Sequence, residues 1–195
     1  AGWNYLLTLC TFVTTFFVSH SHDFWRKSYG LSRSVQGRLN DIGLLCATNA
    51  HRDVGTGELT DEAKEFLDTT ARNLRLVHTL FYADVCYRKT VKETSAIASV
   101  RLLLSFDRVF RTAPGLDRLR DRGLLTDREH QTLVNVQLPP SRWYLVVLEW
   151  VTARIATAQR RGLLSGGDGA ELLLLQKCCD LRSACMSIPD RLAAR

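Results

Sequence analysis

The stretch that decides the fold stands at the beginning of the chain and reads AGWNYLLTLCTFVTTFFVSHSH over residues 1–22. It contains no Asp, Glu, Lys or Arg, although these residues make up 24% of the 195-residue chain. Trp3 and Tyr5 lie at its start, and Trp25 and Tyr29 follow its end. A helix from Trp3 to Trp25 is about 33 Å long, which matches a hydrocarbon core of about 30 Å flanked by interfacial aromatic residues. The stretch therefore predicts a membrane-spanning helix over residues 1–29.

Basic residues follow this stretch on one side only, at Arg26, Lys27, Arg33 and Arg38. The positive-inside rule then places residues 30–195 on the cytosolic or an equivalent side of the membrane. The alternative is a helix buried in the core of a soluble protein, although such helices are usually shorter than a bilayer is thick. The many Thr and Ser hydroxyls of the stretch favour a helix inside a bundle or beside water over one alone in lipid.

One stripe of this helix has two interpretations. Thr8, Phe12 and Phe16 recur every four residues and therefore share a face. Such a face can pack against a neighbouring helix, or it can line a pore in which rings of apolar side chains gate by excluding water. The periodicity alone favours packing.

The charged remainder, residues 30–195, is predicted to be helical throughout. Apolar residues at helical spacing predict helices over residues 36–52, 60–88, 95–111, 116–122, from 126 to the Pro139-Pro140 pair, 141–161 and 169–187. No strand of convincing length and no internal repeat is visible. We therefore expect one antiparallel helical bundle whose core contains Phe66, Leu74, Phe81, Leu103, Leu104, Trp143, Leu145 and Leu148.

Two helix starts carry their own signal. Thr60 precedes Asp61 and Glu62 and is typical of an N-cap with acidic residues in the first turn. Thr126 and Glu129 have the spacing of a capping box, in which each side chain accepts a hydrogen bond from a free backbone amide.

The sequence lacks the usual signals of catalysis and of metal or nucleic-acid binding. It has no phosphate-binding glycine loop, no nucleophile elbow and no metal-ligand spacing, so no catalytic residue, metal site or cofactor is expected. The six cysteines form no disulfide framework and predict free, mostly buried thiols. Net charge is +6, but the basic cluster of residues 118–128 is interleaved with aspartates, which argues against a nucleic-acid partner. An enzyme is not expected.

The run Gly123-Leu124-Leu125-Thr126-Asp127-Arg128-Glu129-His130-Gln131-Thr132-Leu133, followed by Leu138-Pro139, resembles a segment of the bestrophins. Upstream, residues 12–18 with Phe24-Trp25 and Tyr29 are similar to the second membrane helix of that family and its Arg-Trp-Trp end. Phe24 and Arg26 depart from that pattern. Downstream, the helix at residues 143–150 and the helix ending near Cys185 follow in matching order, so the resemblance covers almost the whole chain.

Bestrophins are pentameric anion channels, and the resemblance implies a homopentamer in a lipid bilayer that conducts chloride or similar small anions passively, without a cofactor. The three positions that line the family's hydrophobic neck fall on Thr8, Phe12 and Phe16. Thr8 departs from the usual aliphatic residue there. On this resemblance residues 1–195 are expected to be a fragment, truncated at both ends, that carries the second membrane helix and the cytosolic helical block.

Two other functions remain open on the sequence. The chain could be a single-pass, membrane-anchored helical adaptor that binds protein partners and conducts nothing. It could also be a soluble helical regulator in which residues 1–22 are buried.

Overall fold

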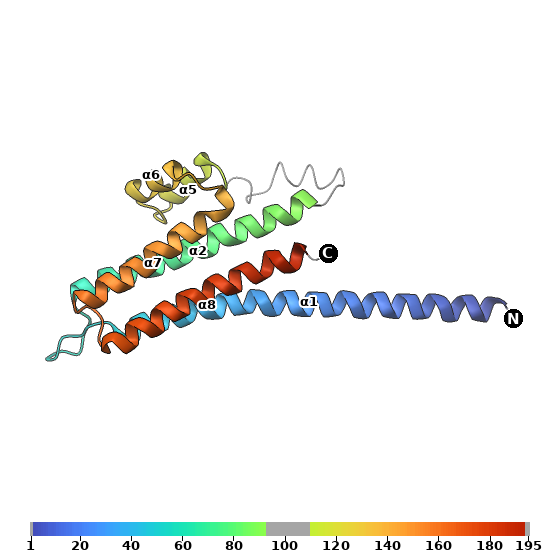
Figure 1. Cartoon of the computed structure of the whole chain (residues 1–195), viewed down its shortest axis with the longest axis horizontal. Helices are drawn as coiled ribbons and strands as arrows, with labels where there is room; N and C mark the ends of the chain where they lie inside the picture. The colour runs from blue at the N-terminus through green and yellow to red at the C-terminus, as the bar shows by residue number, and fades with distance from the viewer. Residues whose placement is uncertain (1, 93–109, 194–195) are drawn as a thin grey trace.

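The computed structural model describes residues 2–92 and 110–193, and within these ranges the chain is helical (Figure 1). The only β-type pairings there are two isolated bridges, Ala50 with Leu164 and Arg52 with Leu59. The elements, in chain order, are α1 (Gly2–Asn49), α2 (Asp61–Lys92), α5 (Ala113–Asp121), α6 (Asp127–Asn135), the 3₁₀ helix η1 (Pro140–Arg142), α7 (Trp143–Arg160) and α8 (Gly167–Ala193). The predicted all-α class is confirmed, whereas the helix predicted over residues 95–111 lies almost entirely outside the described residues.

Four long helices form two antiparallel pairs, as Figure 1 shows. α1 packs mainly on α8 and α2 mainly on α7, and the two pairs meet chiefly through α7 and α8. The short helices α5 and α6 pack on each other, and α6 is joined to α2 by the ion pair between Glu129 and Arg72. The N-terminal part of α1 continues well beyond the bundle (Figure 1).

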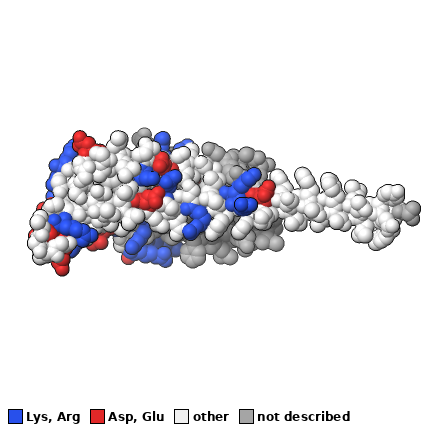
Figure 2. Space-filling view, turned by 90° about the horizontal axis from the view of Figure 1, so that it is seen from below, with Lys and Arg blue, Asp and Glu red and all other residues white. Residues whose placement is uncertain are grey.

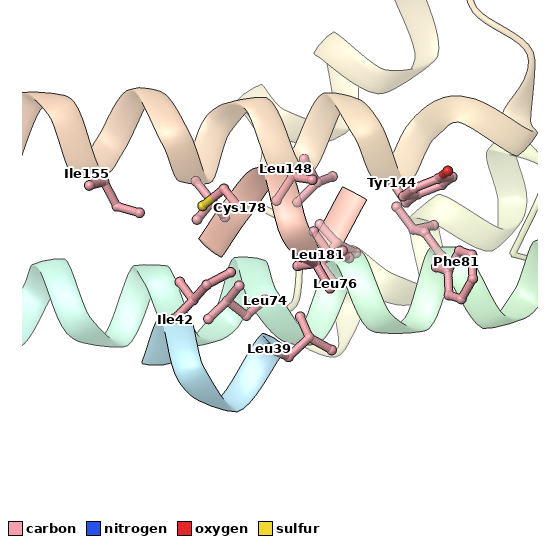
Figure 3. Close-up of a cluster of buried hydrophobic side chains, with 14 of the residues drawn as sticks. Leu39, Ile42, Leu74, Leu76, Phe81, Tyr144, Leu148, Ile155, Cys178 and Leu181 are labelled. Carbon is pink, nitrogen blue, oxygen red and sulfur yellow. The ribbon is translucent and has the colours of Figure 1, made fainter. Parts of the chain in front are cut away.

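The core lies where the four long helices face one another (Figure 3). α1 contributes Ile42, α2 contributes Phe81, α7 contributes Ile155 and α8 contributes Leu181, each no more than 1% exposed. The core positions predicted within the described residues are Phe66, Leu74, Phe81, Trp143 and Leu148, which are buried, and Leu145, which is half-buried. Leu103 and Leu104 lie outside the described residues.

Several helix boundaries differ from the prediction, most clearly in α1, α5 and α8. The expected separate helices over residues 1–29 and 36–52 are one continuous helix of 48 residues. A change from uncharged to charged residues alters the surroundings a helix prefers, but it does not interrupt the backbone hydrogen bonds. α5 begins at Ala113 instead of Leu116, because Pro114 has no amide hydrogen to lose in the first turn and the Thr112 hydroxyl caps the Gly115 amide. α8 continues past Ser187, with Pro189 inside it.

Both predicted caps are confirmed. The Thr60 hydroxyl accepts a hydrogen bond from the Ala63 amide at 3.3 Å. At α6, the Thr126 hydroxyl accepts from the Glu129 amide at 3.3 Å while the Glu129 carboxylate accepts from the Thr126 amide at 2.9 Å. These contacts satisfy amides that a helix start otherwise leaves free.

Candidate functional site

The N-terminal part of α1 is a free helix with an apolar surface. Every residue from 2 to 20 is exposed, and Val35 is the first buried residue of the helix. Phe12, Phe16 and Phe17 are 68%, 67% and 67% exposed. Figure 2 shows this segment extending from the charged bundle without a Lys, Arg, Asp or Glu on the visible face. So large an exposed apolar surface marks a site of interaction with lipid or with other protein.

The threonines of this segment hydrogen-bond within the helix. The Thr8 hydroxyl donates to the Asn4 carbonyl at 2.9 Å, and the Thr11 hydroxyl donates to the Leu7 carbonyl at 2.8 Å. Because these hydroxyls already have an acceptor, their transfer to apolar surroundings costs less than their number suggests.

The direction of the stripe formed by Thr8, Phe12 and Phe16 follows from the continuity of α1. An α-helix returns to the same angle after 18 residues, about five turns. Thr8 is therefore in phase with Arg26 and with Leu44, which is 67% exposed although Ile42 and Cys46 beside it are buried. Thr8 therefore lies on the same side of α1 as Leu44, which is the side that faces away from the bundle.

The same relationship separates the two phenylalanines at positions 16 and 17. Phe16 is in phase with Ser34, which is exposed, whereas Phe17 is in phase with Val35, which is 1% exposed. Phe12 is likewise in phase with Gly30, where an added Cβ would meet no atom within 4 Å. Exposure within the free segment does not distinguish these positions, but their phase places Phe17 on the bundle-facing side and Phe12 and Phe16 away from it.

A hydrogen bond joins α1 to α2 through side chains that are distant in the sequence. The Tyr82 hydroxyl and the Ser32 hydroxyl lie 2.6 Å apart in a hydrogen bond. The Tyr82 ring also packs on His78, with ring centroids 4.7 Å apart. Burial lowers the pKa of His78 below its ordinary value, so its ring is neutral at physiological pH. The tyrosine and histidine give no recognisable sequence signal for this contact, because Ser32 is 50 residues away.

A groove of about 810 Å³ lies between α1 and α2. Its apolar wall includes Leu39, Leu44, Leu67 and Leu74, and His78 also lines it. No sequence pattern predicts this groove, because it arises from the spacing of two helices that both pack more closely on other partners.

The cysteines divide evenly between the core and the surface. Cys46, Cys178 and Cys185 are buried, whereas Cys10, Cys86 and Cys179 are exposed, so the expectation of mostly buried thiols holds for half of them. Burial raises the pKa of each of the three buried thiols to about 12. They are therefore protonated at neutral pH and act as small apolar side chains. Among the described residues, no three His, Cys, Asp or Glu side chains are grouped to hold a metal ion.

Two further findings concern the helices that the structure describes and the relatives of the whole chain. Of the helices that the structure describes, none combines the length and the apolar character needed to cross a membrane. Comparison of the chain with models of protein families, with curated proteins and with solved structures finds no match.

Proposed function

We propose that this chain is a subunit of a bestrophin-like oligomeric channel that conducts chloride or similar small anions passively. The free end of α1 enters the bilayer, and Thr8, Phe12 and Phe16 line a hydrophobic neck around the axis of a homopentamer. The bundle lies on the cytosolic or an equivalent side. The observation that carries the proposal is the phase of α1, which turns these three positions away from the bundle while Phe17 shares the angle of the buried Val35.

The moderate hydropathy of the free end agrees with this role. A helix that lines a pore contacts lipid or protein on part of its circumference and faces the aqueous path on the rest. It therefore needs an apolar surface on fewer sides than an isolated span does. The Thr8 and Thr11 hydroxyls, bonded to the preceding turn, reduce the remaining cost. The resemblance of residues 123–139 to the bestrophins supports the same assignment.

Reconstitution of the full-length protein into planar bilayers tests the proposal. We expect a current whose reversal potential follows the chloride gradient and not the potassium gradient. Native mass spectrometry of the detergent-solubilised protein should give the mass of five subunits. A protein that inserts into the bilayer and carries no current, or a current that follows the cation gradient, contradicts the channel.

The groove between α1 and α2 favours a second function, that of a membrane-anchored helical adaptor. Its apolar wall, with Leu44 67% exposed, suits an amphipathic helix of a protein partner. An adaptor predicts membrane insertion without conductance, so the same reconstitution distinguishes the two functions.

A further inference from the structure

The groove between α1 and α2 has the length and the open space that a third helix needs. Its α1 wall runs from Gln36 to Ala47, and its α2 wall runs from Leu67 to Thr79. At a rise of about 1.5 Å for each residue, the walls are about 16–18 Å long, which is about three turns of helix. Gly43 on the α1 wall borders open space, because a Cβ added there would meet no neighbouring side chain within 4 Å.

Two charges of opposite sign lie on one edge of this groove. Asp68 and Arg75 both line it from α2, and both are exposed. Because they are seven residues apart, they differ by only about 20° around the helix and lie about 10 Å apart along it. Among the described residues neither side chain has an ion pair or a hydrogen bond, whereas Arg72 between them holds Glu129. The two charges are therefore free to bind an occupant of the groove.

An apolar stripe of α2 lies between this charged edge and the core. Leu67, Ala71 and Leu74 succeed one another at intervals of four and three residues. Leu67 is half-buried, Leu74 is 7% exposed and the small side chain of Ala71 is exposed. The stripe is recessed, so an occupant must present protruding apolar side chains to it and charged side chains to the edge. An amphipathic helix presents both.

We infer that the groove binds an amphipathic helix of a partner protein, which carries a basic and an acidic residue seven positions apart. The basic residue pairs with Asp68 and the acidic residue with Arg75, while the apolar side chains of the partner helix cover Leu67, Ala71 and Leu74. The inference rests on the adaptor function proposed above, in which this groove receives a protein partner. Charge pairs of this kind contribute more to the register and specificity of binding than to its affinity.

Surfaces of a second copy of this chain do not combine the required shape and charge. An antiparallel pair of α2 helices from two copies would match Asp68 with Arg75, but it would set one recessed stripe against another and leave both grooves unfilled. The free segment of α1 protrudes, but residues 1–22 contain no charged residue. α8 exposes Leu172 and Leu173, but no acidic and basic residue within it are seven positions apart. A helix of a different protein is therefore the occupant that the groove favours.

The probe is a fluorescein-labelled synthetic helical peptide of about 18 residues. It has a stripe of leucines and, on one edge of that stripe, one Lys and one Glu seven residues apart. Fluorescence anisotropy of the peptide, titrated with the full-length protein in nanodiscs of neutral lipid, measures its dissociation constant. We expect saturable binding below about 1 mM.

Variants of α2 and matched controls on α7 locate the bound peptide. Asp68→Lys should weaken binding at least about threefold. Ala71→Lys places a long side chain over the stripe and should weaken binding at least about tenfold. Glu149→Lys and Ala153→Lys make the same two changes at exposed positions of α7, which does not line the groove, and should bind as the wild type does. A second peptide, with Glu in place of its Lys, should bind Asp68→Lys more tightly than it binds the wild type.

The outcomes separate this site from the functions proposed above. Absence of saturable binding, or equal binding to the wild type, Asp68→Lys and Ala71→Lys, overturns the site, because the peptide then binds elsewhere or only to lipid. Equal weakening in the α7 controls assigns the effect to general surface charge and also overturns it. A changed number of subunits in Ala71→Lys without peptide, measured by native mass spectrometry, assigns the groove to a neighbouring copy and overturns the partner helix. A protein that inserts without current and fails to bind the peptide loses this site but keeps the adaptor function. A protein that conducts chloride and shows the expected binding pattern contradicts an adaptor that conducts nothing and supports the site.

Discussion

The guanidinium of Arg72 in α2 holds both carboxylate oxygens of Glu129 in α6, across 57 residues of sequence. The Nη2–Oε1 distance is 2.9 Å, and Nη1 also donates to the Leu124 carbonyl at 3.1 Å. The same carboxylate accepts the Thr126 amide in the capping box. Arg72 therefore joins α2 to the start of α6 through Glu129, and to the loop that precedes α6 through the Leu124 carbonyl.

Removal of Arg72 should destabilise the protein strongly. Its side chain is 20% exposed and that of Glu129 is 15% exposed, so Arg72→Ala leaves a largely buried carboxylate without its cation. We expect a loss of about 2–3 kcal/mol in the free energy of unfolding, measured by denaturant titration followed by circular dichroism. Arg161 pairs with Glu62 at the surface, with side chains 60% and 64% exposed. Arg161→Ala should therefore cost less than about 1 kcal/mol, and equal losses for the two variants would contradict the role of burial.

The ion pair should also make the protein sensitive to acid. Burial alone would raise the pKa of Glu129, but the hydrogen bonds from Arg72 and from the Thr126 amide together lower it below the ordinary value of 4.5. The stabilisation is therefore complete above the ordinary pKa and is lost as the pH falls through the lowered pKa of the folded state. Denaturation midpoints measured from pH 7 to below pH 4 should fall less steeply in Glu129→Gln than in the wild type. Parallel pH profiles would contradict this assignment.

Thr126 should contribute through its cap alone. Thr126→Ala frees the Glu129 amide at the start of α6 and should cost about 1 kcal/mol in thermal or denaturant unfolding. The control is Thr132→Ala, in the same helix, whose exposed hydroxyl bonds only to the Arg128 carbonyl; its cost should be within about 0.5 kcal/mol of zero. If the proposed channel conducts, its permeability ratios should be unchanged in Thr126→Ala, because the cap hydrogen bonds lie within the start of α6 and not on the proposed neck.

The capping box illustrates what the sequence can and cannot predict. Thr126 and Glu129 are three residues apart, so their relationship is local and visible in the sequence. Arg72 has no such signal, because its partner comes near only when α6 packs on α2. The same reason hides the hydrogen bond between Tyr82 and Ser32 and the groove between α1 and α2. Helical periodicity predicts most of the described core, whereas the unbroken course of α1 past Tyr29 has no signal of its own, because the change from uncharged to charged residues resembles a boundary.

Adjacent cysteines should differ in reactivity. Cys178 is buried, and burial is the main cause that raises its pKa to about 12, whereas Cys179 is exposed. With a water-soluble maleimide at pH 7.5, Cys179 should be labelled in the native protein and Cys178 only after unfolding. Peptide mapping by mass spectrometry identifies the labelled residue. Equal labelling of the two in the native state would show that α8 does not pack on the bundle as described.

The last prediction concerns the neck, and it follows from the phase of α1. Phe12 and Phe16 lie at angles that correspond to the exposed Gly30 and Ser34, whereas Phe17 corresponds to the buried Val35 and Val13 to the half-buried Leu31. In the proposed pentamer, five phenylalanine rings at one level narrow the path enough to exclude water. Phe12→Ala/Phe16→Ala should therefore widen the neck and raise the open probability in single-channel records. Phe17→Ala is the matched control, and it should mainly weaken packing and leave the open probability near the wild-type value.

Cysteines introduced singly at positions 12, 13, 16 and 17 of a Cys10→Ser background give an independent readout. A charged thiol reagent applied from the aqueous side should block current through positions 12 and 16. Block through position 17 with none through 12 or 16 would place the opposite face of α1 on the axis and refute this neck.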